Sequence, residues 1–279
     1  MTPTVIARGL AFPEGPVWFD GTLLVTEIAA GRIARWWPGG GEETELVADV
    51  GGGPNGATLG PDGALYVTQN GGLFSEQRVP GGIVRVDLAD GSWDYVAQEV
   101  GGLRLDGPND LAFGPDGRLW FTDPRGADDP TKNDQPGRIF ALDASNGDGD
   151  LVAELDPVFP NGIGFDAAGR LLWTESFSRR VMAAGGNGIA DECVIELPEK
   201  HYPDGFCVGA GGELYIASTY AHCVSVVRDG AIAERLVCGD GMATNCCFGG
   251  EDGRQLFITD SRRGLIWRAD LGVDGLALH

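Results

Sequence analysis

Short runs of β-forming residues, often alternating between apolar and polar positions, recur along this chain, and each follows a glycine-containing turn. One turn-plus-strand phrase occurs six times: GTLLVTE (21–27), GPDGALYVTQ (60–69), GPDGRLWFTD (114–123), DAAGRLLWTE (166–175), GAGGELYIAS (209–218) and GEDGRQLFITD (250–260). The last residues of successive phrases lie 42, 54, 52, 43 and 42 positions apart. Self-similarity at such a period indicates a repeat architecture.

Each phrase predicts a hairpin with the short β-forming run that precedes its turn. A third run follows, as in GRIARWWP (31–38) and GRIFALD (137–143), and then a fourth, as in ELVAD (45–49) and ERLVC (234–238). Four antiparallel strands per unit are typical of a propeller blade. The sequence therefore predicts an all-β fold, a six-bladed β-propeller that forms a single domain over residues 1–279.

The two ends of the chain are complementary parts of one blade. TVIARGL (4–10) resembles the fourth runs, whereas the last unit ends soon after its third run at 264–271. We therefore predict that the N-terminal strand completes the last blade and closes the ring, which would leave only short, protected sheet edges.

A second phrase recurs just before each hairpin and places an oxygen-bearing side chain at one equivalent position. The phrases are PEGPVW, PNGATL, PNDLAF, PNGIGF, PDGFCV and TNCCFG, and their second residues are Glu14, Asn55, Asn109, Asn161, Asp204 and Asn245. Each of these residues precedes the end of its hairpin by 13 to 15 positions. Since asparagine, aspartate and glycine are common in turns, ordinary turn chemistry is an alternative explanation.

In a propeller the first strand of each blade lines the central channel, so these six residues should form a ring at one mouth. Clustered carboxylates and amides are costly to bury unless a cation or ordered water lies among them. Oxygen ligands of this kind suit one divalent cation, and Ca²⁺ fits them best, with Zn²⁺, Mn²⁺ or Mg²⁺ as alternatives. Glu14 and Asp204 together would balance its two charges.

Composition narrows the possible partners. The formal net charge is −21, which makes nucleic acid and anionic membranes poor partners. The N-terminal residues do not resemble a signal peptide, and no long apolar run is present. We expect a cytoplasmic protein that acts on a small-molecule substrate, does not bind membranes, and is a monomer or a weak homo-oligomer. The six cysteines, all within 193–247, are expected to be mostly buried apolar residues.

The phrases PEGPVW, LDGPNDLAFGPDGRLWFTDP, FPNGIGF and YPDGFCV resemble the senescence marker protein / gluconolactonase / luciferin-regenerating enzyme family, in order and over nearly the whole chain. The resemblance implies a calcium-dependent lactonase-type six-bladed propeller, similar in fold to calcium-dependent organophosphate hydrolases. It implies that Glu14, Asn161 and Asp204 are metal ligands and that Asp204 performs acid/base catalysis. It also implies that Asn109 contacts metal or substrate.

The chain departs from the animal members of that family at one position. Those members carry an arginine two residues before the equivalent of Asn109, where this chain has Gly107, and Arg104 is the nearest arginine. We take Asn109, Asn55, Arg104 and Tyr220 as candidate substrate-binding residues. Selectivity should depend on loops at the same mouth. These loops offer Phe74, Arg78, Arg125, Lys132, Phe177, Arg179, His201, Tyr202, His222 and Arg262 as further candidates.

The expected function is a metal-dependent hydrolase that opens a small lactone, a sugar lactone or a related cyclic ester, by attack of a metal-activated water, with Asp204 as acid and base. Two alternatives remain. One is hydrolysis of organophosphates or phosphofluoridates on the same metal. The other is a non-catalytic propeller that binds calcium and docks a partner.

Overall fold

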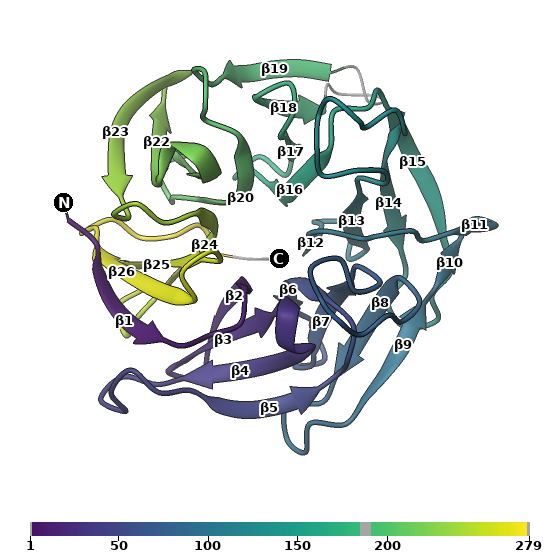
Figure 1. Ribbon diagram of the computed structural model, residues 1–279. Coiled ribbons are helices and arrows are strands. Elements are labelled where there is room, and N and C mark those ends of the chain that lie inside the picture. Colours follow the sequence, from purple (N-terminus) through teal and green to yellow (C-terminus); the bar gives the residue numbers. More distant parts are fainter. Residues whose placement is uncertain (1, 185–190, 278–279) are drawn as a thin grey trace.

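The computed structural model describes residues 2–184 and 191–277, and these form six four-stranded antiparallel sheets arranged as blades around a central axis (Figure 1). Blade 1 consists of β2 (Pro13–Phe19), β3 (Thr22–Glu27), β4 (Arg32–Trp36) and β5 (Glu45–Asp49). Blade 2 consists of β6 (Pro54–Leu59), β7 (Leu65–Gln69), β8 (Gly82–Val86) and β9 (Trp93–Ala97). Blade 3 consists of β12 (Leu111–Phe113), β13 (Leu119–Asp123), β14 (Gly137–Leu142) and β15 (Gly149–Leu155). Blade 4 consists of β16 (Pro160–Phe165), β17 (Leu171–Glu175), β18 (Arg180–Ala184) and β19 (Asp191–Glu196). Blade 5 consists of β20 (Pro203–Val208), β21 (Leu214–Ser218), β22 (Cys223–Arg228) and β23 (Ala231–Val237). The predicted six-bladed propeller is confirmed.

Both ends of the chain build blade 6, as predicted. Its inner three strands are β24 (Ala243–Gly249), β25 (Gln255–Asp260) and β26 (Leu265–Asp270). The outer strand is β1 (Thr4–Arg8), which pairs antiparallel with β26. In Figure 1 the purple N-terminal strand lies beside the yellow C-terminal strands. Ala7 of β1 and Leu10 just after it are buried, so the closing strand also contributes to the core.

The first strand of each blade lies nearest the axis. Each of these inner strands contacts the inner strand of the next blade, and β24 contacts β2, which closes the ring. Helix is limited, within the described ranges, to two three-residue 3-10 turns, η1 (Ile28–Ala30) and η2 (Thr219–Ala221). One feature was not predicted: a small two-stranded sheet of β10 (Glu99–Val100) and β11 (Leu103–Arg104), which follows blade 2 in the sequence and contacts β15 of blade 3.

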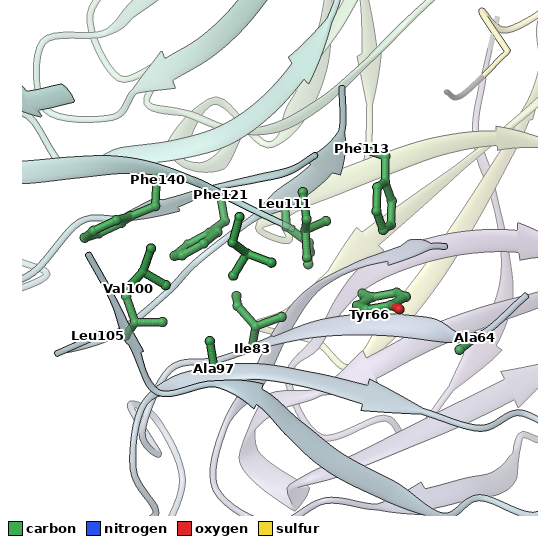
Figure 2. Packing of buried hydrophobic residues seen from close by; sticks show 12 residues of the cluster. Ala64, Tyr66, Ile83, Ala97, Val100, Leu105, Leu111, Phe113, Phe121 and Phe140 are labelled. Atoms are coloured by element: carbon green, nitrogen blue, oxygen red, sulfur yellow. The ribbon is translucent and has the colours of Figure 1, made fainter. Parts of the chain in front are cut away.

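The hydrophobic core lies between adjacent blades. Figure 2 shows the cluster between blades 2 and 3, where Tyr66 and Ile83 of blade 2 face Phe113 and Phe121 of blade 3. The rings of Tyr66 and Phe113 meet edge to face, with centroids 5.3 Å apart. Because the alternating side chains of each twisted sheet pack against both neighbouring blades, burial of apolar area holds the blades together around the ring.

None of the helical segments in the described part of the chain is long and apolar enough to cross a membrane.

Closure by β1 makes a testable prediction. Deletion of residues 1–9 should lower the melting temperature by about 10 °C, because it removes the backbone bonds to β26 and the buried Ala7 and leaves an exposed sheet edge. Calorimetry would measure the change. Deletion of residues 1–3, which precede β1, is the matched control and should have little effect. An unchanged melting temperature in the longer deletion would contradict closure of the ring by this strand.

Candidate functional site

A cavity of about 580 Å³ opens at one mouth of the central channel. Five of the six ring positions line it together: Glu14, Asn55, Asn109, Asn161 and Asp204. Glu14, Asn55 and Asn161 are buried, whereas Asp204 keeps some exposure to the cavity. Side chains up to 190 positions apart in the sequence therefore line one cavity, as the repeat predicted.

A break in strand pairing lies at nearly every ring position. The register between the first and second strands shifts between Glu14 and Val17 in blade 1 and between Pro160 and Ile163 in blade 4, and blades 2 and 5 have equivalent shifts. In blade 6 the shift lies earlier, between Ala243 and Asn245. In blade 3 the ladder begins only at Leu111, after the ring residue. Bulges of this kind redirect side chains and are common beside functional sites. Here they lie where the ring side chains face the cavity.

Threonine hydroxyl groups connect the ring residues of adjacent blades. Four threonines at one equivalent position of the second strands donate to the backbone carbonyl oxygen of the next blade's ring residue, over 2.6 to 2.8 Å: Thr26 to Asn55, Thr68 to Asn109, Thr122 to Asn161 and Thr174 to Asp204. Blade 5 has Ala217 at this position, and Thr259 of blade 6 bonds to Asn245 of its own blade. The hydroxyl groups thus fix the spacing of four of the six ring positions.

The glycine after the ring residue has a packing role. A Cβ atom on Gly15 would lie 2.4 Å from the carbonyl oxygen of Asn55, and one on Gly162 would lie 2.6 Å from that of Asp204. Only glycine permits such a close approach of neighbouring inner strands. The Pro-Glu-Gly and Pro-Asn-Gly phrases lie within β2 and β16, so the alternative that they are ordinary turns is wrong for these blades.

The two ring carboxylates lie in an environment that disfavours their charge. Burial raises the pKa of Glu14 to about 7. Burial, followed by the negative charges of Glu14 and Asp110, raises the pKa of Asp204 well above its usual range. No ion pair found among the described residues involves Glu14 or Asp204. A bound cation would supply the missing positive charge and return both groups to the ionised form.

The donor set fits a hard cation that prefers oxygen. Within residues 2–184 and 191–277, no three acidic, histidine or cysteine side chains come together in a way that could hold a metal ion. Binding would therefore need amide oxygens in addition to the two carboxylates. Asn161 donates from Nδ2 to Ser176 Oγ over 3.2 Å and also to Asp204, which leaves its Oδ1 free to coordinate a metal. Mixed carboxylate and amide sets are typical of calcium sites and atypical of zinc sites.

Asn245 does not line this cavity, although its side chain is hydrogen-bonded to the ring residue Glu14. It lines a smaller cavity further along the channel, together with Asp110, and its Nδ2 donates to Asp110 Oδ2 over 3.5 Å. Burial raises the pKa of Asp110 to about 7, and the charge of Glu14 adds to the shift. Sequence analysis missed Asp110. Its signal was an aspartate at a position where blades 1, 2, 4 and 5 have glycine.

The remaining candidates divide between the cavity and other parts of the surface. Tyr220 lines the cavity, as do three other loop residues from the candidate set, Phe74, Phe177 and Tyr202. Arg104 does not line it, because this residue belongs to β11 and pairs with Glu99 of β10, and β10 contacts β15, the outermost strand of blade 3. The expected contact of Arg104 with substrate therefore lacks structural support.

None of the other predicted arginine and lysine residues of the loops lines the cavity either, namely Arg78, Arg125, Lys132, Arg179 and Arg262. Arg125 pairs with Asp106 at 2.7 Å, and Lys132 pairs with Asp129 at 2.8 Å. Lys200, which sequence analysis did not identify, is the cationic residue that lines the cavity within the described chain.

A second set of buried acids has a structural role. Glu27, Asp123 and Asp260 end the hairpins, and each accepts a backbone N–H from the segment that leads into its blade's inner strand, at 2.6 to 2.9 Å. Glu27 is also paired with Arg32 at 2.7 Å. These three acids hold the loops that precede the ring residues of their own blades.

Comparison with known proteins agrees with this geometry. A sequence profile described as "SMP-30/Gluconolactonase/LRE-like region" matches residues 12–262. The chain is 27% identical to a gluconolactonase of Zymomonas mobilis over 290 aligned positions, covering 92% of this chain and 78% of that protein, and 25% identical to regucalcin of Xenopus laevis, covering 94% and 87%. A solved gluconolactonase structure from Xanthomonas campestris is 25% identical with a TM-score of 0.76, covering 98% of this chain and 89% of that one.

The threonine bonds between blades can be tested by removing one hydroxyl. Thr122→Val would leave the carbonyl oxygen of Asn161 and the N–H of Asp110 without their partner, so unfolding in urea should show a loss of about 1–3 kcal/mol. Thr4→Val is the control, since Thr4 is exposed and its bond to Arg268 is long at 3.5 Å. Equal losses in the two variants would show that the threonine bond does not stabilise the ring.

Proposed function

The chain belongs to the SMP-30/gluconolactonase/LRE-like family, and from this premise we propose that it hydrolyses a small lactone at the cavity on the propeller axis. The activity named for two relatives, the gluconolactonases of Zymomonas mobilis and Xanthomonas campestris, supports this reaction class. The observation that carries the proposal is the convergence of Glu14 and Asp204 with Asn55, Asn109 and Asn161 at the floor of one cavity.

Glu14, Asn161 and Asp204 would hold one divalent cation, with Asn109 completing the set. Ca²⁺ is the cation that this combination of oxygen ligands favours, because it takes six to eight such ligands, including water. When bound, the cation polarises an ester carbonyl and stabilises the negative charge that develops on its oxygen. The buried carboxylates and their raised pKa values support this assignment, since an uncompensated pair of charges would be costly in this environment.

Asp204 is the proposed acid and base. Its carboxylate would accept a proton from the attacking water and deliver it to the ring oxygen of the lactone as the acyl–oxygen bond breaks. The bond that Asp204 receives from Asn161 and the one that its backbone carbonyl accepts from Thr174 fix its position. Asn55 and Asn109, on blades 2 and 3, would orient the substrate carbonyl by donating from their amide groups.

The two alternative functions make different predictions. If the site hydrolyses phosphotriesters, organophosphates should be turned over faster than lactones. A docking propeller would bind the cation tightly and hydrolyse neither class. Activity assays with lactones and organophosphates, each with and without chelator, distinguish the three.

We predict that chelation abolishes lactone hydrolysis and lowers stability. Calcium at 100 times its dissociation constant should contribute about 2.7 kcal/mol to the free energy of unfolding, which EGTA would remove. Thermal melting and a lactone assay in EGTA, followed by readdition of Ca²⁺, would measure both effects. Full activity in EGTA would exclude a role for the cation.

The two carboxylates should separate ligand binding from catalysis. Asp204→Asn keeps an oxygen ligand but removes the base, so kcat should fall about 10²–10⁴-fold. Glu14→Gln removes one charge without removing a base, so it should weaken Ca²⁺ affinity by about one to two orders of magnitude. Calorimetric titration of Ca²⁺ and steady-state kinetics give the two readouts.

Excess Ca²⁺ provides the internal control for this pair. It should restore much of the activity of Glu14→Gln and little of the activity of Asp204→Asn. Parental kinetics and parental Ca²⁺ affinity in both variants would rule out the axial site as the reaction centre.

A further inference from the structure

Three pairs of aromatic rings form the walls of the cavity above the ring of oxygen ligands. Phe12 stacks on Phe74 with ring centroids 5.0 Å apart and planes 12° apart. Phe159 and Phe177 are also 5.0 Å apart, at 35°, and Tyr202 meets Tyr220 at 5.4 Å and 70°. All six side chains line the same cavity, where Leu73, Ile28 and Met242 add further apolar surface.

The repeat places one member of each pair at an equivalent position. Phe12, Phe159 and Tyr202 each stand two residues before the ring residue of blades 1, 4 and 5, where blades 2 and 3 have glycine. The backbone carbonyl oxygens of Phe12 and Phe159 accept bonds from the N–H groups of Ile28 and Ser176, at 3.0 and 3.1 Å. The backbone segments that carry these aromatic residues are therefore the same segments that lead into the ring residues.

Three of the wall residues adopt a backbone conformation that is rare for bulky side chains. Phe12, Phe74 and Phe159 have φ values of 60°, 65° and 55°, in the left-handed region. A conformation of this kind is energetically unfavourable for a bulky side chain and is concentrated at binding and catalytic sites. The fold thus maintains strained backbone at the positions that direct phenylalanine rings over the cavity.

The hydroxyl groups of two wall residues, Ser176 and Thr244, already have partners within the protein. Ser176 Oγ donates to the carbonyl oxygen of Pro203 at 2.7 Å, and Thr244 Oγ1 bonds to Ser261 Oγ at 2.5 Å. Asp128 and Lys200 also line the cavity, but both are exposed to solvent. A substrate with several hydroxyl groups would bury them against aromatic carbon, and each unpaired hydroxyl lowers affinity.

We propose that the cavity selects lactones that carry a flat, apolar group, such as an aryl-fused ring, over polyhydroxylated sugar lactones. This inference rests on the proposed lactonase function. The ester group would lie at the floor, beside the ring oxygens, and the apolar group would lie between the aromatic pairs, where edge and face contacts with six rings are available. Phe74 and Tyr220, with 48% and 57% of their surface exposed, gain the most burial from such a ligand.

The test compares two probes, dihydrocoumarin and D-glucono-1,5-lactone, in saturating Ca²⁺ and with the uncatalysed rates subtracted. We expect a kcat/KM at least about tenfold higher for dihydrocoumarin, because burial of apolar surface contributes to its binding alone. Phe177→Ala and Tyr220→Ala should each lower the ratio of kcat/KM for dihydrocoumarin to kcat/KM for gluconolactone about fivefold to tenfold, mainly through the KM for dihydrocoumarin.

Trp93→Ala is the matched control, because Trp93 is an exposed aromatic residue on β9, the outermost strand of blade 2, and does not line the cavity. It should change neither value. Tyr220 is largely exposed, so its replacement tests the wall even if Phe177→Ala is unstable.

The outcomes separate the two proposals. Equal or better turnover of gluconolactone, or equal losses for both probes in the wall variants, would overturn the aromatic selectivity while retaining the lactonase. Turnover of neither probe in Ca²⁺ would overturn the lactonase function itself, and with it the selectivity that rests on it.

Discussion

The geometry of the site depends on a hydrogen bond that crosses from one blade to the next. The six blades are separate sheets, so few backbone bonds join one to another, and apolar packing between them is not directional. The hydroxyl groups of Thr26, Thr68, Thr122 and Thr174 add direction, because each holds the carbonyl oxygen of the next ring residue at a fixed distance. Burial keeps the blades together, and these bonds determine where their polar side chains meet.

That arrangement has a free-energy cost which the protein must offset elsewhere. Glu14, Asp110 and Asp204 lie close enough along one channel for their charges to interact, and burial raises the pKa of all three. The bulges at the ring positions interrupt the sheet ladders as well. Extensive burial between six blades, with the ring closed by β1, offsets these local costs. A site of this kind requires a rigid scaffold, since relaxation would let the carboxylates separate.

The repeat was sufficient to predict the blades, the closing strand and the convergence of five ring residues, because these follow from strand periodicity and equivalence of position. Prediction from the sequence failed for residues whose position depends on tertiary contacts. Asn245 has the ring position and bonds to Glu14 and Asp110, but it does not line the cavity, and in blade 6 the pairing shift precedes the ring residue. Arg104 is close to Asn109 in sequence but lies in a separate two-stranded sheet. The pairing of six aromatic side chains depends on loop conformations that no periodic pattern encodes.

Chemistry and selectivity come from neighbouring positions of one repeat but follow different physical rules. The ring residue lies inside a strand, where a bulge, a glycine and a threonine bond from the next blade restrict it, so few side chains are compatible with the position. In most blades the residue two positions earlier lies outside the paired strand. Its main structural contribution is a backbone carbonyl oxygen that accepts one hydrogen bond. Its side chain is therefore free to vary, from phenylalanine and tyrosine to glycine within this single chain. A change at that position would alter the wall of the cavity without moving the ring residues beside it, so the proposed lactonase could keep its carboxylates and amides while the range of lactones that fit the cavity changes.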